Sequence, residues 1–168
     1  MMMQKPNRPS APDSRRVTAA PRERAIQILT SHLAGHGLRM TSQRETVLDY
    51  MLDSEAHGSM EEISADLRKR GVGRATVFRT VKLLEECHLI SRVSGADGTS
   101  RYETTFERPH HDHLICIDCG GFQEVSWPEV ERIQSRTCRE MRFQPLWHRH
   151  EIFGRCERCS SGSRSKKH

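Results

Sequence analysis

The sequence predicts an α+β protein of two small domains. Three observations predict it. Helical patterns recur between residues 22 and 90, a turn signal then separates two short strand-like runs, and residues 105–159 mix strand patterns with one helix and two C-x-x-C pairs. A chain of 168 residues can hold one ordinary domain or two small ones, so the second arrangement fits the length.

Four amphipathic helices are predicted in the N-terminal half. The first covers residues 22–36, where apolar side chains recur at helical spacing before two glycines. The second lies in MTSQRETVLDYML, where Thr41 can cap. The third starts at Ser59, which has capping-box spacing to Glu62, and stops at Gly71. The fourth, ATVFRTVKLLEE, turns Val77, Val81 and Leu84 to one face and basic side chains to the other.

Two helices joined by a glycine-containing turn, the second with arginine and lysine outward, form the helix-turn-helix pattern of DNA-binding proteins. The runs LISRVS and SRYET then flank GADG, which predicts a hairpin. Helices followed by a small hairpin make a winged helix, here residues 21–104, with a hinge near 95–110. Amphipathic helices with outward arginines are also common in proteins that do not bind DNA. The prediction of DNA binding therefore depends as well on the wing and on the metal-binding second domain.

The C-terminal half, residues 105–159, predicts a small α/β domain. HLICID and GFQEVSW are typical of strands, and Pro128 suits the first turn of a helix. FQPLWHRHEIFGRC predicts a last strand that ends at the second C-x-x-C pair. A domain this small buries little apolar surface, so we expect a bound metal or a cross-link to stabilise it.

The net charge of +5 comes from the two ends of the chain. Residues 1–20, a predicted disordered basic extension, carry +3, and the predicted disordered tail, residues 160–168, carries another +3. The body between them has a net charge of −1, so overall basicity gives no evidence for nucleic-acid binding. No apolar run approaches the ~20 residues that span a bilayer, and the N-terminus lacks the apolar region of a secretory signal. We therefore expect no membrane association and a cytoplasmic location.

Four of the six cysteines form two C-x-x-C pairs with 36 residues between them. In a reducing cytosol this spacing favours a four-thiolate Zn²⁺ site over a disulfide framework. Unrelated free cysteines and a redox C-x-x-C are the alternatives. The zinc ligands would be Cys116, Cys119, Cys156 and Cys159.

A histidine cluster stands immediately before the first cysteine pair, in HHDHLICIDCGG. In a strand, His111 and His113 would share one face, while His110 and Asp112 would share the other. The cluster therefore divides into two sets, each able to gather further imidazole or carboxylate ligands for Fe²⁺, Mn²⁺, Zn²⁺ or Ni²⁺. The alternative is a solvated polar turn. Candidates for the further ligands are Glu103, Glu124, Glu131 and His148.

These motifs together resemble the ferric uptake regulator family of bacterial metal-dependent repressors. ATVFRTVKLLEE is similar to the family's recognition helix, and HHDHLICIDCG to its metal motif. The resemblance covers roughly residues 25–159. It implies an N-terminal winged helix, a C-terminal α/β dimerisation domain, and a homodimer, with pairing into tetramers left open, on a double-stranded DNA operator.

The resemblance also implies ligand sets. The four cysteines match a structural Zn²⁺ site. A regulatory site between the domains matches His57, Glu103, His111, His113 and Glu124. A third site matches His110, Asp112, Glu131 and His148. Thr76, Phe78 and Arg79 would approach bases, while Arg39, Arg44, Arg74 and Lys82 would lie near phosphates or a flanking groove.

Relatives sense iron, zinc, manganese, nickel or peroxide. Glu103 and Glu124 stand where peroxide sensors typically carry aspartates, which favours an Fe²⁺-dependent repressor of iron-uptake genes; Mn²⁺ or Zn²⁺ could replace Fe²⁺ in vitro. A zinc- or peroxide-responsive regulator is the near alternative, and a metallohydrolase or a zinc-stapled interaction module are distant ones. No separate nucleophile–base pair is present, so no enzyme is expected. Phe78 stands where the family usually has tyrosine, and His150 has no counterpart.

Overall fold

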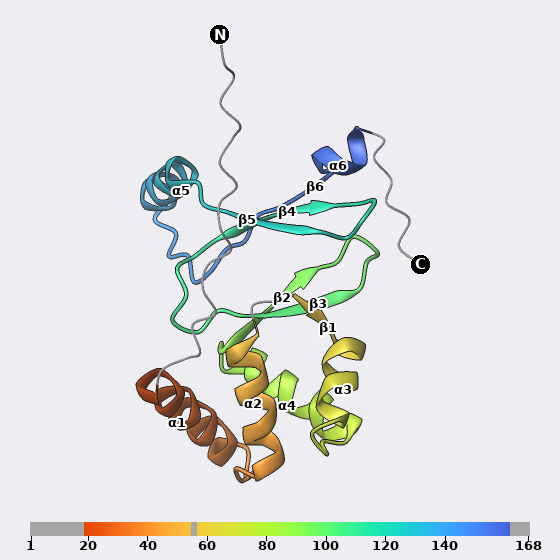
Figure 1. Cartoon of the computed structure of the whole chain (residues 1–168). Coiled ribbons are helices and arrows are strands. Elements are labelled where there is room, and N and C mark those ends of the chain that lie inside the picture. Colours follow the sequence, from red (N-terminus) through yellow and green to blue (C-terminus); the bar gives the residue numbers. More distant parts are fainter. Residues whose placement is uncertain (1–18, 55–56, 162–168) are drawn as a thin grey trace.

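The structure is a computed structural model that describes residues 19–54 and 57–161. Four helices form the base of the molecule, under a three-stranded sheet, and a second three-stranded sheet lies above the first (Figure 1). The helices of the base are α1 (Ala19–Gly35), α2 (Ser42–Asp53), α3 (Met60–Arg68) and α4 (Arg74–Glu86). Helices before a hairpin, then a separate α/β unit, confirm the predicted α+β class.

The lower sheet is antiparallel and has the order β1–β3–β2. Its strands are β1 (Gly58–Ser59), β2 (Ile90–Ser94) and β3 (Ser100–Thr104). The predicted GADG turn joins β2 to β3, and Gly98 there has φ +77°, a conformation that favours glycine. β1 was not predicted, because two residues are too few to show an alternating pattern.

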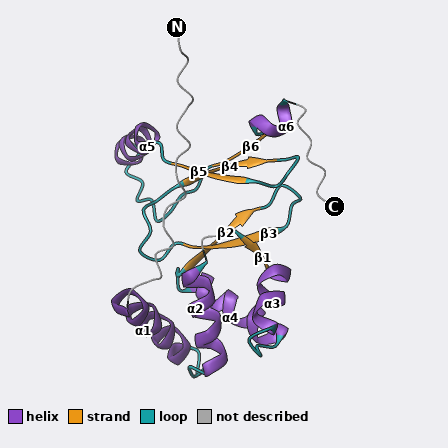
Figure 2. Ribbon diagram, viewed as in Figure 1, coloured by secondary structure: helices purple, strands orange, loops and turns teal. Residues whose placement is uncertain are grey.

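The upper sheet has the order β5–β4–β6, with β6 parallel to β4 (Figure 2). Its strands are β4 (Asp112–Cys116), β5 (Phe122–Val125) and β6 (Glu151–Gly154), accompanied by helices α5 (Pro128–Glu140) and α6 (Glu157–Ser160). The long last strand predicted over 143–156 is wrong, since only Glu151–Gly154 is strand. Pro145 lacks the N–H that a strand interior needs, which is one physical reason.

Local signals start the helices as the sequence predicts. The Thr41 hydroxyl accepts the Arg44 N–H at the start of α2, and Ser59 forms a reciprocal capping box with Glu62 at the start of α3. Pro128 occupies the first turn of α5. The outer limits differ, because α1 begins at Ala19, inside the stretch predicted as disordered, and α6 extends to Ser160. The rest of both predicted terminal segments, 1–18 and 162–168, lies outside the described residues.

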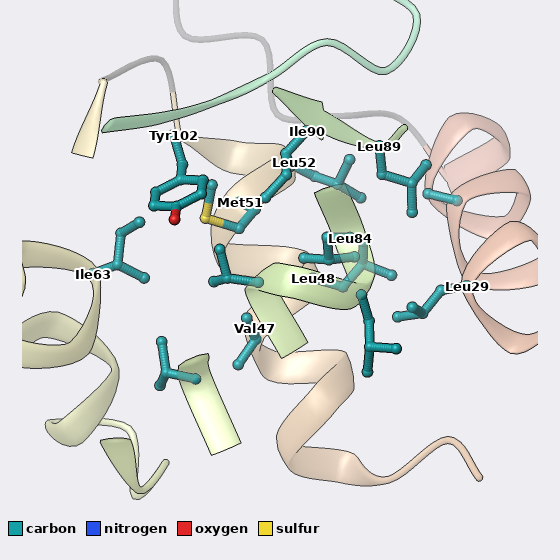
Figure 3. Packing of buried hydrophobic residues seen from close by; sticks show 14 of the residues in the cluster. Leu29, Val47, Leu48, Met51, Leu52, Ile63, Leu84, Leu89, Ile90 and Tyr102 are labelled. Carbon is teal, nitrogen blue, oxygen red and sulfur yellow. The ribbon is translucent and has the colours of Figure 1, made fainter. Parts of the chain in front are cut away.

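The apolar core belongs to the N-terminal half. Leu29, Leu48, Ile63, Leu84 and Tyr102 come from different elements and meet in one buried cluster (Figure 3). In the part of the C-terminal half that the structure describes, only Ile115 and Cys116 are buried apolar side chains, and α5 buries none. Hydrophobic burial alone therefore gives the C-terminal half little stability.

Two hydrogen bonds join β2 to the segment that contains β6. The Glu151 carboxylate on β6 accepts the Ser94 N–H of β2 at 3.0 Å, and the Arg149 guanidinium donates to the Arg92 carbonyl at 2.8 Å. They hold the hairpin of the lower sheet against the upper sheet.

Candidate metal centres and the DNA-facing helix

The four cysteines of the C-x-x-C pairs come together at one end of the upper sheet. Cys116 ends β4, Cys119 lies in the following turn, Cys156 precedes α6 and Cys159 lies within it. Their four Sγ atoms lie within 4.8 Å of one another. The Cys119 and Cys156 Sγ atoms are 3.8 Å apart, close to the edge, about 3.8 Å, of a tetrahedron with Zn–S bonds of ~2.3 Å. The donor set therefore fits a four-thiolate Zn²⁺.

The four thiols of this group differ in pKa. The backbone N–H of Cys156 donates to the Cys116 sulfur at 3.3 Å and, with other N–H groups, lowers the pKa of Cys116 to about 6. The pKa of Cys159 is raised to about 12, first by its contact with the Cys156 thiol. The pKa of Cys156 is lowered as well, chiefly by the Cys159 backbone N–H, so without a cation Cys116 and Cys156 ionise more readily than Cys159.

A second group forms between the two sheets and joins the halves of the molecule. His57 precedes β1, Glu103 lies on β3, and His111 and His113 belong to the segment entering β4. One carboxylate oxygen of Glu103 lies 2.9, 3.0 and 3.3 Å from the Nε2 atoms of His57, His111 and His113. Three imidazoles and a carboxylate thus converge on one point, and we call these four residues the junction cluster.

The junction cluster is buried: Glu103 is 6% and His113 3% exposed. Burial would raise the pKa of Glu103, but hydrogen bonds from His111, His113 and His57 outweigh it and hold that pKa well below its usual range. The hydrogen bond to Glu103 in turn raises the pKa of His111 to about 9. A buried negative centre surrounded by imidazoles is a suitable donor set for a divalent cation.

His57 is held in place by two residues that the sequence did not single out. Its ring stacks on Phe122 of β5, with centroids 4.5 Å apart and planes 4° apart. Arg101 donates to the His57 carbonyl at 3.1 Å and also contacts Glu62, the capping-box residue of α3, at 3.2 Å. For Phe122 the sequence offered one signal, an aromatic side chain shortly after the first C-x-x-C pair. That signal fits an ordinary strand residue equally well.

Glu124, predicted as a fifth ligand of the regulatory site, lies beside the junction cluster rather than in it. It pairs with His113 across β4 and β5, and its carboxylate is 3.8 Å from the His111 Nε2 atom. Its side chain is 46% exposed.

The residues predicted for a third site meet on the other side of β4. His110, Glu131 and His148 place their donor atoms within 4.8 Å of one another, with His148 2.9 Å from the Glu131 carboxylate. Asp112, 1% exposed, lies 3.1 Å from the His110 Nε2 atom. Its Oδ2 atom has no hydrogen-bond partner among the described residues. A buried carboxylate oxygen without a partner is what a cation site would satisfy.

His150, which had no counterpart in the family pattern, lies at the edge of this third group. Its Nδ1 atom is 3.7 Å from the free Oδ2 of Asp112, while its Nε2 atom contacts the Gln134 amide at 2.9 Å. It is therefore a neighbour of the group.

A cavity of about 580 Å³ opens between the halves. His110, His111, His113 and His148 all line it, so it reaches both histidine groups.

The predicted DNA contacts lie on the outer side of the N-terminal half. Arg74, Phe78, Arg79 and Lys82 are exposed on α4, and Thr76 is half-buried. The Lys82 ammonium lies 5.2 Å from the centre of the Phe78 ring. Val77, Val81 and Leu84 are buried on the opposite face, as predicted.

Arg39 and Arg44 stand near the start of α2, where Gln43 donates to the Gly71 carbonyl just before α4. Arg39 is exposed, whereas Arg44 is half-buried and donates to the Arg39 carbonyl. The Arg44 guanidinium is therefore partly occupied within the protein.

Comparison with known proteins places this fold in the class of metal-responsive transcription regulators. The sequence model of the ferric uptake regulator family matches residues 35–153, and the chain belongs to this family. Its members are regulators and not enzymes, so this chain is a regulator too. No helix in the described ranges is long and apolar enough to cross a membrane.

Individual relatives agree with this assignment. The chain is 42% identical over 120 residues to a ferric uptake regulation protein of Rhizobium leguminosarum bv. viciae, covering 70% of this chain and 84% of that one. It is 29% identical over 126 residues to the peroxide operon regulator of Bacillus subtilis, covering 74% and 86%. The structure of the Helicobacter pylori ferric uptake regulator, described as having three functional metal-binding sites, matches with a TM-score of 0.72 at 28% identity, covering 87% of this chain and 97% of that one.

Proposed function

We propose that the chain is an Fe²⁺-dependent repressor of iron-uptake genes that acts in the cytoplasm as a homodimer on an operator. The observation that carries this proposal is the junction cluster, because its donors come from both halves of the molecule. In this proposal Cys116, Cys119, Cys156 and Cys159 hold a structural Zn²⁺. The junction cluster with Glu124 holds the regulatory Fe²⁺, and His110, Asp112, Glu131 and His148 form a third site.

When bound, Fe²⁺ would supply a positive charge at the Glu103 carboxylate, and the imidazoles of both halves would hold it. His57 and Glu103 reach the cluster from the winged helix, while His111 and His113 reach it from the upper sheet. These side chains can converge only when the two halves have one relative orientation. A bound metal would therefore favour that orientation, and DNA binding would be favoured to the extent that the same orientation fits the operator.

Phe122 and Arg101 prepare the winged-helix side of this junction. The stack on Phe122 and the hydrogen bond from Arg101 restrain the His57 ring before any ion arrives. A restrained ligand loses less conformational freedom on binding, which raises affinity.

The exposed face of α4 supplies the operator contacts in this proposal. Thr76, Phe78 and Arg79 approach base edges in the major groove, and Arg39, Arg44, Arg74 and Lys82 approach phosphates or a flanking groove. The Phe78 ring can contact a thymine methyl group, although it lacks the hydroxyl of tyrosine.

A second copy of the chain is the partner we propose for the C-terminal half. Large apolar side chains are exposed there: Leu146 by 88%, Trp147 by 76% and Ile133 by 54%. Ile152 and Phe153 are consecutive on β6 and both about half exposed, so apolar groups emerge on both faces of that strand. An exposed apolar surface of this kind marks an interface. Two-fold pairing would present two α4 helices to a pseudo-palindromic operator.

The test is a DNA-binding titration of protein stripped of its regulatory metal, using a duplex selected from a random-sequence pool. For each metal, the free concentration that restores DNA binding is divided by the level of that metal in the cell. This quotient should be lower for Fe²⁺ than for Mn²⁺ or Zn²⁺, and peroxide should leave the Fe²⁺-bound protein active. Activation by Zn²⁺ alone, or rapid loss of binding on peroxide treatment with oxidised histidine, would replace the iron assignment by the corresponding regulator of the same family. DNA binding that ignores every metal would reject the proposal.

A further inference from the structure

We propose that His32, His36 and Glu86 form a further divalent-metal site, which shares no residue with the three groups above and is independent of the proposed function. The donor atoms of these three residues lie within 4.8 Å of one another. The His32 Nε2 atom is 3.1 Å from the Glu86 carboxylate, and the two imidazole rings are 4.5 Å apart. We call these three residues the helix cluster.

The spacing of the two histidines suits chelation. His32 lies in the last turn of α1, and His36 directly follows the last helical residue, Gly35, so the two rings come together at the end of the helix. Glu86 reaches them from the last turn of α4, which packs beside α1. Two imidazoles from the end of one helix and the turn after it, with a carboxylate from a second helix, make a three-donor set that leaves positions open for water.

His36 is already oriented as a ligand. Its Nδ1 atom lies 2.9 Å from the His32 carbonyl, so Nδ1 carries the proton and donates it. The Nε2 lone pair is then free to bind a cation. Metal-bound histidines commonly use this arrangement, in which the second ring nitrogen donates to a backbone carbonyl and fixes the tautomer.

The surroundings favour a cation as well. The cluster lies at the C-terminal end of α1, which is the negative end of the helix dipole. The Glu86 side chain is 53% exposed and His36 is exposed, so an ion can enter from solvent. Imidazole and carboxylate donors bind Zn²⁺, Ni²⁺ and Cu²⁺ more strongly than Fe²⁺ or Mn²⁺. The helix cluster is therefore a site for these three metals.

An ion in the helix cluster would join α1 to α4. The junction cluster fixes how the two halves are oriented, whereas the helix cluster acts within the winged helix. It restrains the C-terminal end of α4 against α1. Occupancy should therefore raise the thermal stability of the N-terminal half.

The experiment counts bound Ni²⁺ by equilibrium dialysis of the full chain with its cysteine site loaded with zinc. His36→Ala and Glu86→Gln should each bind about one Ni²⁺ fewer per chain than the wild type. Both residues are exposed, so circular dichroism should show an unchanged fold. The rise in melting temperature that Ni²⁺ produces should shrink in both variants.

The matched control is His88→Asn. His88 is an exposed histidine two residues from Glu86 and outside the cluster, and asparagine tolerates its positive φ of 58°. This variant should keep the wild-type Ni²⁺ count. In a His111→Ala background, adding His36→Ala should again lower the count by about one Ni²⁺ per chain. Equal Ni²⁺ counts in the wild type, His36→Ala and Glu86→Gln would overturn the proposal and leave His32 and Glu86 as an ordinary interhelical ion pair.

Discussion

Replacing Glu103 by glutamine should destabilise the protein strongly at pH 6 and much less at pH 10, when the junction cluster is free of metal. The Glu103 carboxylate holds the protonated His111 ring at 3.0 Å and raises its pKa to about 9. A neutral amide cannot stabilise that charge. The His111 side chain is only 14% exposed, so solvent screening removes little of the interaction.

The magnitude follows from the pKa difference. Because the folded pKa of His111 is raised above its unfolded value of about 6.5, the stabilisation is fully present below pH 6.5 and is lost as pH rises through about 9. At 1.36 kcal/mol per pKa unit, this gives roughly 3 kcal/mol at pH 6 and about 2.5 kcal/mol at pH 7. The depressed pKa of Glu103 already includes this contact with His111, together with those of His113 and His57, so the His111 interaction is counted once.

Urea unfolding at pH 6, 7, 8.5 and 10 measures this directly, with a chelator too weak to remove zinc from the four cysteines. The difference between wild type and Glu103→Gln should fall from roughly 3 kcal/mol to below about 1 kcal/mol across that range. Glu129→Gln, at a side chain 86% exposed, should stay within about 0.5 kcal/mol of wild type throughout. A Glu103→Gln difference that does not change with pH would refute the reasoning.

Three further substitutions test other parts of the account. Cys119→Ser should lower zinc content below one ion per chain, and losing ~3 kcal/mol should reduce the melting temperature by roughly 6–12 °C; unchanged zinc and melting would argue against the four-cysteine site. Phe122→Leu should weaken metal binding at the junction cluster by roughly 2–10-fold in a competition titration, because a stacked ring contributes ~0.5–1.5 kcal/mol, whereas Phe122→Tyr should bind normally; equal affinity for the leucine variant would remove Phe122 from the site. Arg79→Ala should reduce operator-specific binding by roughly 5–150-fold in a gel-shift assay, and a change in the salt dependence alone would make Arg79 a phosphate contact instead.

Local rules predicted those parts of the molecule that depend on neighbouring residues. The caps at Thr41 and Ser59 follow from side chains that bond within one helical turn. Strand alternation alone separated His111 and His113 from His110 and Asp112, and the structure places the two pairs in different groups. Short-range geometry decided both results.

Features set by distant packing could not be predicted. The stack of His57 on Phe122 joins residues 65 positions apart, and the helix cluster depends on how α1 packs on α4. The strand predicted over 143–156 was wrong for a related reason. Its apolar residues, among them Leu146 and Trp147, indicate a strand but are exposed in the single chain. A partner's surface, rather than a core, accounts for such side chains in the proposed dimer.

The central claim is that metal in the junction cluster orients the winged helix for DNA. The most direct measurement is the ratio of operator Kd without and with saturating Fe²⁺, in the wild type and in His111→Ala. The account predicts a ratio of roughly 5–150 for the wild type, a ratio near one for His111→Ala, and an intact dimer by sedimentation in both. An undiminished metal response in His111→Ala would contradict it.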